Sequence, residues 1–594
     1  MLHDSKIFFR RKFRKRRTQV ESLSARAEHA SERFFFKRLD RLVAVRRFVA
    51  GWLVLVALLC AALVGQIRAL DGYFQTLQPT TGGIFTEGIL GDFTNANPLY
   101  ATNQVDESVS KLIFAGLFKY DDDNNLIGDL AAGYTVDPGG KTYTVTLKPG
   151  LTWHDGAPLT AEDVVFTYGM IQNPDALSVL NRGWQGITIA VVDPLTVSFT
   201  LPSVLGSFPY NMTNGIIPKH LLKDVAPSEM RSVSFNTERP VGAGPFAWQN
   251  IEVTGESPET RQSKIALQPF QGYHGGAPKL ASFVVHAFHD AEQLREGFKN
   301  QELTAASIMD PPKDLVEQDG INSNSFMLSA ANMVFFKHSN PVLADVAVRK
   351  ALVQSVDVQA IIDSLSYPTH PVRGPFLLGQ LGYDNTQVQP VFDVAAATAG
   401  LDAAGWKLGE DGVRSKAGVP LRFSLYGQDT AESRMVTGQL VKAWSTIGVA
   451  PIVRLQSSED LQRSISSRDY DALLYGISVG VDPDVFVYWH GSQTDVRSSG
   501  LNFSEFKSKT ADVSLEAGRT RIEPDLRVVK YKPFLQAWQQ DVPALGLYQP
   551  HYEYLTHGIV YGMERHVLNT NTDRYNNVNN WQIREIEQTN QRPQ

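Results

Sequence analysis

The chain has 594 residues, a net charge of −6 and a single cysteine, Cys60. This length excludes a single hydrophobic core and predicts about three or four domains, since a typical domain has roughly 150 residues; one cysteine excludes a disulfide within the chain. The charge is divided unevenly, because residues 1–47 carry fifteen Lys and Arg against five Asp and Glu, a net +10, so the remainder carries −16. This division indicates that the two parts lie in different compartments.

Residues 48–67 predict a membrane-spanning helix. The run from Phe48 to Gly65 is unbroken in apolar residues, and its continuation to Ile67 gives about 30 Å of helix, enough to cross the hydrocarbon core of a bilayer. The excess of Lys and Arg lies before the run, and only Arg68 follows closely. The positive-inside rule therefore places residues 1–47 in the cytoplasm and the chain after about residue 70 outside the membrane.

A cleaved secretory signal is the alternative to an uncleaved anchor. The basic leader is long and no clear small-x-small site follows the apolar run, so the sequence favours the anchor. Leu59 stands before Cys60 where a lipoprotein signal requires a small residue, which argues against lipidation. The basic run Arg10–Arg17 could also bind anionic lipid or nucleic acid, but a role in setting membrane topology is favoured, and we expect no nucleic-acid partner.

A strand, a turn, a loop and a capped helix follow one another within residues 137–171. Apolar side chains alternate with threonines along Thr142–Leu147, which predicts a half-buried strand, and a Gly-Gly pair supplies the turn before it. Thr160 can cap a helix that has Asp163 in its first turn. Apolar residues then recur at helical spacing: Val164, Tyr168 and Ile171.

The letters WHDGAPLTAEDVVF in this segment resemble a signature of the peptide/nickel-type solute-binding proteins of ABC importers, the family 5 type. Further segments resemble the same family in order and spacing, so the resemblance covers roughly 82–560. These segments are NPLY ending at Tyr100, Asp129–Ala131 with Tyr134, Ile217–His220, Pro240–Phe246, Tyr273–Leu280, Asp345–Ala351 and Asp541–Pro550.

The resemblance implies an α/β fold with two lobes, like the class II periplasmic binding proteins with an extra inserted subdomain, behind one N-terminal transmembrane helix. Lobe I would hold residues 82–325 and 545–594, with the inserted subdomain near 118–225, and lobe II would hold residues 326–544. Two chain crossings between the lobes would form a hinge that closes around a ligand.

The C-terminal half favours a two-layer α/β architecture independently of the family. Helical spacing and strand character alternate along it: Val436, Leu440, Ala443 and Ile447 on one helix, Val449–Leu455 as a strand, Leu461 and Ile465 on a second helix, and Tyr470–Tyr475 as a strand. Strands that alternate with helices favour parallel pairing.

Asp482-Pro483-Asp484 could supply paired carboxylates for acid–base chemistry or for holding an amine. The structural alternative, which we favour, is a helix start with Asp482 as the cap and Pro483 in the first helical position. The family resemblance places this segment at the cleft, so the two roles can coexist. The family resemblance as a whole implies that Asn95, Val479, Asp482, Asp484 and Trp489 contact the ligand.

The sequence departs from the family where dipeptide-type members hold the two ends of their ligand. Those members carry an Asp three residues before the Asp-Pro-Asp segment, whereas Val479 stands here, and no Arg occurs at Tyr426–Gln428, where the family grips the ligand's carboxylate. Because buried charges need partners, we expect a longer peptide held by its backbone, or a less charged solute held by aromatics such as Trp489, Tyr488 and Trp406. The signature segment 137–171 is not expected to touch the ligand.

Gly476–Gly480 matches the G-x-S-x-G pattern of serine hydrolases, and Asp541 and His551 follow in hydrolase order. The match is weak, because a helix must begin at the serine, whereas Pro483 breaks the chain shortly afterwards. A serine hydrolase that uses Ser478 is therefore the alternative to a binding protein without catalytic residues.

His286 and His289 could suggest a metal site, but they lie three apart on a predicted strand, which sends their side chains to opposite faces. We therefore expect no metal site. No Walker A motif occurs, because Gly374–Gly379 lacks the following Gly-Lys pair, so ATP hydrolysis would belong to a separate subunit.

The sequence as a whole predicts a membrane-anchored, extracytoplasmic solute-binding protein that closes two lobes over a peptide-like solute. It would use no cofactor, and would deliver the solute to the permease and ATPase subunits of an ABC importer. Oligosaccharides, nickel complexes and opines are the rival ligands within this class. A receptor that uses the same fold and signals through residues 1–47 is a further alternative.

Overall fold

The computed structural model describes residues 46–589 except 256, 258–259, 309–310, 496–499 and 565–566. The chain divides into two compact units. The first holds helix α3 (Arg46–Phe74) and most of a ribbon of two paired strands, β1 (Gln75–Thr80) and β23 (Arg584–Thr589). The second unit, Pro79–Arg584, holds the remaining elements. The expected basic segment, 1–47, lies almost wholly outside the described residues.

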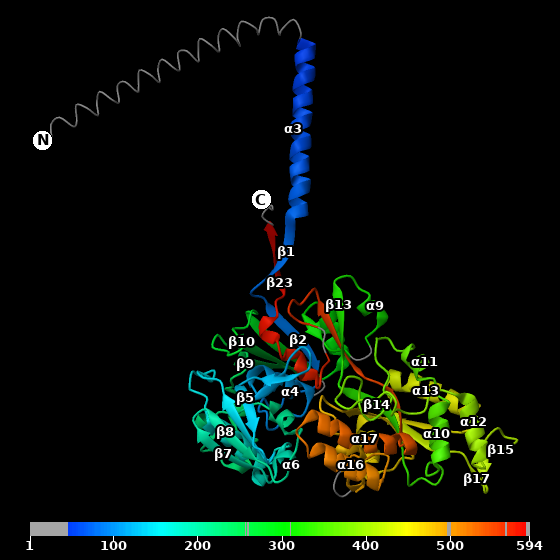
Figure 1. The fold of residues 1–594 in the computed structure, drawn as a ribbon. Helices are drawn as coiled ribbons and strands as arrows, with labels where there is room; N and C mark the ends of the chain where they lie inside the picture. The colour runs from blue at the N-terminus through cyan, green and yellow to red at the C-terminus, as the bar shows by residue number, and fades with distance from the viewer. Residues whose placement is uncertain are drawn as a thin grey trace, which may run out of the picture. The chain divides into compact units, whose positions relative to one another are not determined.

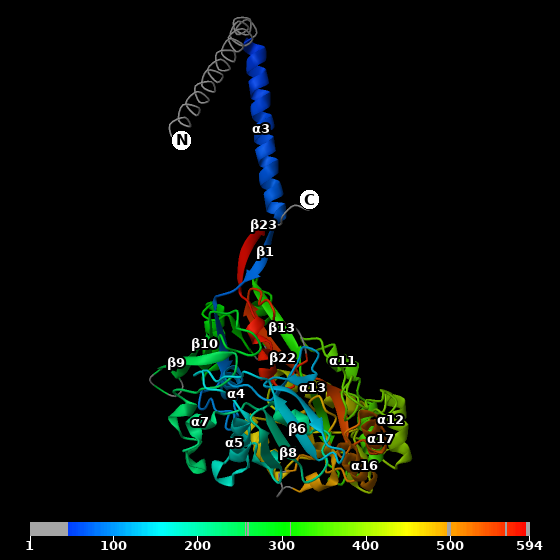
Figure 2. The same ribbon diagram turned by 60° about the vertical axis from the view of Figure 1, so that its left-hand side comes forward.

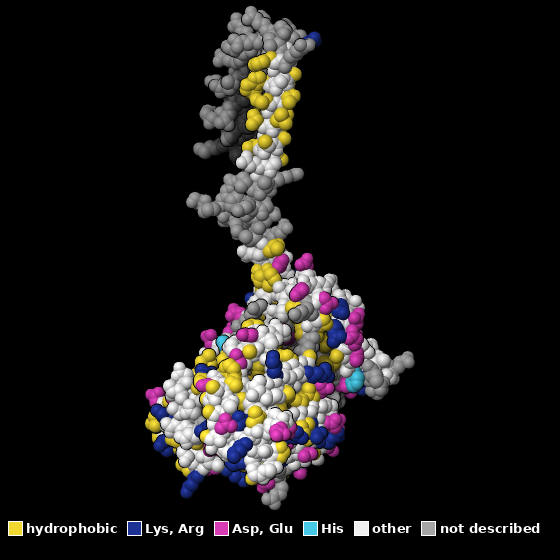
Figure 3. Space-filling model, turned by 90° about the vertical axis from the view of Figure 1, so that its right-hand side faces the viewer, with side chains coloured by type: hydrophobic (Ala, Val, Ile, Leu, Met, Phe, Trp, Pro, Cys, Tyr) yellow, Lys and Arg dark blue, Asp and Glu magenta, His cyan; other side chains and the backbone are white. Residues whose placement is uncertain are grey.

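Apolar side chains cover helix α3 between Phe48 and Gln66 (Figure 3). This stretch has a mean hydropathy of 2.6, and none of it is buried. Within the part of the chain that the structure describes, α3 is the one helix long and apolar enough to cross a membrane. Its apolar stretch agrees with the segment 48–67 predicted from the sequence.

We use lobe I for the part of the second unit that is built on a mixed seven-stranded sheet. Strand β2 lies inside this sheet, because it pairs in parallel with both β11 and β12. Helices α4 (Gln104–Ile113) and α8 (Ala291–Lys299) pack against β2, and α9 (Lys313–Val316) packs against β13. The strand order is β13-β22-β12-β2-β11-β10-β9. The strands are β2 (Ile84–Leu90), β9 (Phe246–Thr254), β10 (Gln262–Pro269), β11 (Ser282–Phe288), β12 (Ala305–Ala306), β13 (Ile321–Met327) and β22 (His551–His557).

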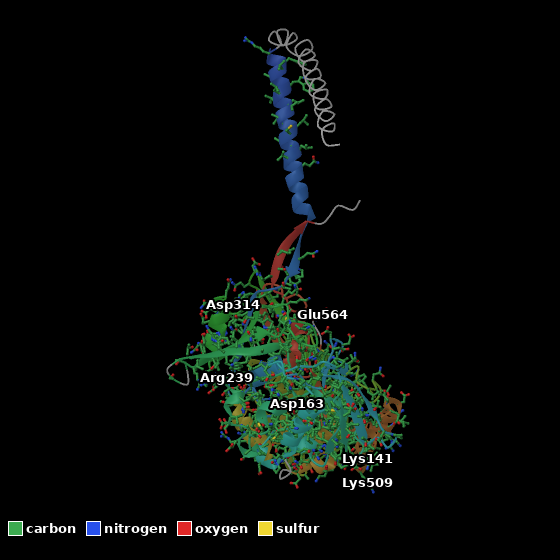
Figure 4. All side chains as sticks on the ribbon, turned by 90° about the vertical axis from the view of Figure 1, so that its left-hand side faces the viewer. Lys141, Asp163, Arg239, Asp314, Lys509 and Glu564 are labelled. Atoms are coloured by element: carbon green, nitrogen blue, oxygen red, sulfur yellow. The ribbon has the colours of Figure 1, made fainter. Side chains whose placement is uncertain are left out.

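A second, antiparallel sheet in lobe I lies within residues 118–225, which we propose as the inserted subdomain. Strand β6 spans Thr142–Leu147 as predicted, and its buried residues alternate with the threonines. Helix α5 (Ala161–Gln172) begins after the predicted cap residue Thr160, which forms a capping box with Asp163. Asp163, the third residue of the helix, is labelled in Figure 4. The sheet order is β5-β6-β8-β7. The other elements are β3 (Phe118–Tyr120), β4 (Leu126–Gly128), β5 (Ala131–Val136), β7 (Thr188–Asp193), β8 (Thr196–Thr200), α6 (Asn181–Trp184) and α7 (Lys219–Leu222).

Lobe II, as we use the term, is built on a five-stranded sheet in the order β19-β18-β20-β14-β21. Strand β18 pairs in parallel with β19 and β20, as predicted, whereas β14 pairs antiparallel with β20 and β21. The strands are β14 (Ala330–Phe336), β18 (Ser424–Gln428), β19 (Ile452–Gln456), β20 (Ala472–Ser478) and β21 (Ala544–Tyr548). A small sheet adds β15 (Lys407–Leu408), β16 (Arg414–Lys416) and β17 (Val419–Pro420).

The helices of lobe II make this sheet one layer of an α/β sandwich. Along β14, Val334 and Phe336 enter one hydrophobic cluster and Met333 and Phe335 enter another, so the sheet is buried on both faces. Helices contribute to both clusters, so the predicted two-layer arrangement of this half is wrong and the sheet is the middle one of three layers. The helices are α10 (Val346–Gln354), α11 (Val358–Ile362), α12 (Val394–Ala403), α13 (Ala431–Thr446), α14 (Ser458–Ser467), α15 (Phe486–Trp489), α16 (Lys509–Arg519) and α17 (Pro524–Asp541). The predicted two-lobed α/β fold is thereby confirmed.

The two lobes lie beside each other. Figure 1 shows β5, β7 and β8 of lobe I on one side of this unit and α10, α12 and α17 of lobe II on the other, and Figure 2 brings α5, β6 and β8 to the front. The chain passes between the lobes at 328–329 and at 549–550. There the Leu328 amide donates to the Pro550 carbonyl at 2.9 Å, and Gln549 Nε2 donates to the Leu328 carbonyl at 3.1 Å. The two crossings are therefore joined by hydrogen bonds. Because β21 (Ala544–Tyr548) belongs to the lobe II sheet, we propose that the second crossing follows residue 548 instead of the expected residue 544.

Candidate functional site

A cavity of about 640 Å3 lies between the two lobes, next to the crossings. Its volume is in the range of small-molecule sites. Both lobes and both crossings contribute to it: Asn124, Tyr134, Tyr143 and Tyr210 from lobe I, Ser329 and Gln549 from the crossings, and His370, Gln380, Gly480, Asp482 and Arg527 from lobe II. We call this cavity the cleft.

The loop after β20 is fixed to the first crossing by its backbone. The amides of Val479 and Gly480 both donate to the Ser329 carbonyl at 2.9 Å, and Gln380 Nε2 donates to the Gly480 carbonyl at 2.7 Å. Gly480 has a φ of +72°, which a glycine adopts without steric cost. The loop that lines the cleft is therefore tied directly to the first crossing.

Asp482 lies in this loop and forms a bidentate ion pair with Arg527 of α17. The guanidinium donates to the two carboxylate oxygens at 2.5 and 2.6 Å, and the two side chains are only 8% and 6% exposed. Burial by itself lowers the pKa of Arg527, but the hydrogen bonds and the charge of Asp482 outweigh it, so the pKa is raised. Both charges of the pair are thus present and mutually compensated within the cleft wall.

Asp484 connects the two lobes. Its Oδ2 accepts a hydrogen bond from Ser207 of the inserted subdomain at 3.0 Å and lies 3.1 Å from Arg519 Nη2 of lobe II. The Gly206 amide donates to the Arg519 carbonyl at 2.8 Å beside it, and the Arg519 guanidinium lies 4.2 Å from the centre of the Phe486 ring. We call this group, Gly206, Ser207, Asp484 and Arg519, the interlobe link.

The predicted helix start at Asp482 is wrong, because α15 begins only at Phe486 and its cap position is Val485. The Asp484 amide donates to Asp482 Oδ1 at 3.0 Å, so this carboxylate closes a turn on its own loop. Both of its oxygens also accept hydrogen bonds from Arg527, 45 residues further along the chain. The conformation of this loop therefore depends on a long-range ion pair, which local capping rules do not consider.

The predicted ligand-binding residues lie in different environments. Asp482 lines the cleft, whereas Val479 and Trp489 are buried in a hydrophobic cluster of lobe II, with Trp489 against Phe335 and Trp538. Asn95 is buried in lobe I, where Asn95 Nδ2 donates to the Arg231 carbonyl. Ligand contacts at Asn95, Val479, Asp484 and Trp489 therefore stay predictions, and in this conformation these side chains support the framework.

The other aromatics considered for the ligand also have structural partners. Trp406 is buried and donates from Nε1 to Asp345 Oδ2 at 3.1 Å, and the Tyr488 hydroxyl donates to the Ser478 carbonyl at 2.8 Å. The aromatic side chains of the cleft come instead from the inserted subdomain: Tyr134, Tyr143 and Tyr210. Tyr143 belongs to the signature segment that was not expected to approach the ligand, and burial raises its pKa to about 12, which keeps its hydroxyl protonated.

Sequence reasoning missed these three tyrosines because they lie far from the family's cleft segments. The alternation along Thr142–Leu147 predicted that Tyr143 is buried, but it gave no sign of which cavity the ring would line. Tyr210 lies in a short 3-10 helix, Phe208–Thr213, whose sequence has neither strand nor α-helix periodicity. Only the packing of the inserted subdomain against lobe II brings these rings to the cleft.

The arrangement around Ser478 is not that of a serine hydrolase. Ser478 is the last residue of β20, and the next helix begins at Phe486, so the strand–turn–helix elbow that exposes a nucleophile is not formed. His551 contacts Ser325 Oγ at 2.6 Å, and burial lowers its pKa to about 4, which makes it a weak base at neutral pH. No observation of the described residues favours Ser478 as a nucleophile.

The histidines considered for a metal have other partners. His286 Nε2 lies 2.9 Å from Gln262 Oε1, and His289 Nδ1 lies 3.0 Å from Asp92 Oδ2. Across the described ranges no group of three or more His, Cys, Asp and Glu side chains is arranged to hold a metal ion.

Comparison with known proteins gives a consistent result for most of the chain. The family described as "Bacterial extracellular solute-binding proteins, family 5 Middle" matches residues 125–498. The oligopeptide-binding protein AppA of Bacillus subtilis is 26% identical over 497 residues, which cover 80% of this chain and 87% of AppA.

Solved structures show the same fold. The structure of AppA from Bacillus subtilis in complex with a nonapeptide superimposes with a TM-score of 0.67 at 23% identity, covering 85% of this chain and 100% of AppA. The ABC transporter substrate-binding protein CtaP of Listeria monocytogenes superimposes with a TM-score of 0.73 at 22% identity, again covering 85% of this chain and all of CtaP.

Proposed function

The chain belongs to family 5 of the bacterial extracellular solute-binding proteins, and from this premise we propose that it captures a peptide-like solute in the cleft and delivers it to an ABC importer. The observation that carries the proposal is the position of the cleft, which lies between the two lobes and directly at the two joined crossings. Lobes that rotate about such crossings can close on a solute without any covalent step.

The chemistry of the cleft favours a peptide that is held by its backbone. Asp482 and Arg527 compensate each other, so neither is free for a terminal charge of the ligand. The cleft is lined instead by neutral amide and hydroxyl side chains, such as those of Gln549 and Ser329, beside the tyrosine rings of the inserted subdomain. A relative with the same fold, AppA, is solved with a nonapeptide, which supports a ligand longer than a dipeptide.

The N-terminal part of the chain supports a membrane anchor. Helix α3 holds an apolar stretch, Phe48–Gln66, that is long enough to span a bilayer, and the basic segment before it carries a net charge of +10. By the positive-inside rule, this arrangement keeps residues 1–47 in the cytoplasm and the two lobes outside. The lobes would then work beside the permease and ATPase subunits of the importer.

The proposal is tested by ligand-dependent thermal stability of the full-length chain in detergent micelles. A peptide that binds only the folded state stabilises it by about 2.7 kcal/mol when present at 100 times its Kd, so we expect members of a library of peptides of graded length to raise the melting temperature. Mass spectrometry of the incubated peptides should show them intact. Unchanged melting temperatures across the whole library, or hydrolysed peptides, would contradict the proposal.

A further inference from the structure

Lobe I contains a second cavity, of about 600 Å3, whose lining residues all belong to lobe I. Tyr210 is shared with the lining of the cleft, and its ring is stacked on Tyr120 with the centroids 6.4 Å apart. These two rings therefore stand where the two cavities adjoin. We call the second cavity the lobe I cavity.

One face of helix α4 forms a wall of the lobe I cavity. Glu107, Ser110 and Lys111 line it together with Phe114, the residue that follows the helix. Ser110 and Lys111 lie three and four residues after Glu107, which places the three on the same side of the helix. Trp184 of α6 lines the cavity as well. The cavity therefore combines ionisable groups with large apolar side chains, as binding sites for small solutes do.

The cations of the cavity are already paired. Lys111 Nζ lies 3.8 Å from Asp573 Oδ1, and Lys119 Nζ lies 3.6 Å from Asp129 Oδ1 and donates to the Asn576 carbonyl at 3.1 Å. These two pairs balance the charges of four of the five Asp, Glu and Lys side chains in the lining. The remaining one is Glu107, so the lining has a net charge of −1.

Among the residues that the structure describes, the Glu107 carboxylate forms no ion pair and no side-chain hydrogen bond; the residue lines the cavity and is exposed to solvent there. Partial desolvation by the surrounding protein, and after it the charge of Asp106, raise the pKa of Glu107, while Arg574 lowers it. Arg574 itself is paired with Glu87 at 2.7 Å. The cavity thus presents one acid whose charge is not compensated by a direct contact.

Two further acceptors of the cavity are also left without a donor in the described part of the chain. They are Asn214 Oδ1 and Asn576 Oδ1, both buried without a hydrogen-bond partner, and Asn576 as a whole is only 8% exposed. A buried acceptor without a donor is unfavourable, and buried polar groups in proteins are rarely left in that state. The shortage in this cavity is therefore one of donors.

We propose that the lobe I cavity is a second binding site, for a small solute that carries a protonated amine on an apolar body. The ammonium group would pair with Glu107 and donate to the two asparagine oxygens, and the apolar body would pack against Phe114 and Trp184. This site lies outside the cleft and does not depend on the identity of the solute bound there.

The test is isothermal titration of the full-length protein in detergent with 2-phenylethylamine, and with 2-phenylethanol as the matched probe without a charge. We expect the amine to bind and the alcohol to bind at least tenfold more weakly. Glu107→Gln should weaken amine binding by about tenfold, a loss of roughly 1.4 kcal/mol, while its affinity for the alcohol stays the same.

Glu292→Gln is the control, because Glu292 is also an exposed acid in the first turn of a helix, α8, but it is paired with Arg295 and lines neither cavity. It should leave amine binding unchanged, and the two variants should have similar melting temperatures. Absence of amine binding at millimolar concentrations, or equal binding to wild type and Glu107→Gln, would overturn the proposal.

A second titration separates this site from the cleft. Saturation with a peptide found in the stability experiment should leave amine affinity unchanged, whereas competition between peptide and amine would place the amine in the cleft and overturn the proposal. If no peptide binds, the proposed function fails, but the comparison of Glu107→Gln with Glu292→Gln still decides the lobe I cavity.

Discussion

Asp482 and Glu107 each present a carboxylate to a cavity, but only Asp482 has a cation within hydrogen-bonding distance. The sequence offered Asp482 as a ligand-binding acid because it stands in an Asp-Pro-Asp segment at the expected cleft. The structure shows that this acid is paired with Arg527, whereas Glu107, in a segment without any motif, has no such partner. The availability of a charged side chain is thus decided by its neighbours in space, which a single sequence does not reveal.

Arg527→Met should destabilise the protein strongly, because it leaves the buried Asp482 carboxylate without its partner. Breaking a buried ion pair in this way costs about 3–5 kcal/mol. Urea unfolding of lobe II, followed by tryptophan fluorescence, measures the loss. Arg463→Met is the control, since Arg463 is paired with Glu459 and Asp460 at an exposed site, where about 0.5 kcal/mol is expected. A similar loss of unfolding free energy in both variants would show that the buried pair with Asp482 does not account for the destabilisation.

The elements that were predicted well are those whose signals are local. Strand β6 follows from the alternation along Thr142–Leu147, and the start of α5 follows from Thr160 and Asp163. Strand β19 begins three residues later than predicted, at Ile452, and Pro451 before it has no amide hydrogen for the ladder. The family resemblance supplied the two lobes and the region of the cleft, but not the tyrosines that line it, because these depend on contacts between segments distant in sequence.

Thr160→Ala should lower the free energy of unfolding by about 1 kcal/mol, as the loss of a helix cap does. The effect arises at the start of α5, where the Thr160 amide also donates a hydrogen bond to Asp163 Oδ2 at 2.9 Å. Thermal unfolding monitored by circular dichroism checks it. Thr446→Ala, at the exposed last residue of α13, should change stability by much less; equal effects would argue against a capping role.

At the scale of the whole molecule, two kinds of contact hold the two lobes together. The crossings join the lobes covalently and by the hydrogen bonds between Leu328, Gln549 and Pro550. The interlobe link joins the inserted subdomain to lobe II through Ser207 and Asp484. Opening of the cleft must keep the first set and break the second, so the interlobe link favours the closed state.

Ser207→Ala should therefore weaken solute binding without touching the cleft wall. Loss of one hydrogen bond worth about 0.5–1.5 kcal/mol would raise the Kd of a bound peptide roughly 2- to 10-fold through a less populated closed state. Isothermal titration measures the Kd, and small-angle scattering of the free protein should show a larger radius of gyration. Ser467→Ala, at an exposed serine of α14, is the control; an unchanged Kd in Ser207→Ala would exclude a role for the link in closure.

The position of β22 inside the lobe I sheet has a consequence for biosynthesis. All five strands of the lobe II sheet are contained in residues 330–548, so lobe II can fold as soon as this stretch has left the translocation channel. Lobe I has to wait, because β22 fills the place between β13 and β12, and the fully buried Glu87 is paired with Arg574, 487 residues later. Until residues 551–574 are available, lobe I therefore keeps an open sheet edge and a buried acid without its partner, and an open edge of this kind favours aggregation of the incomplete chain.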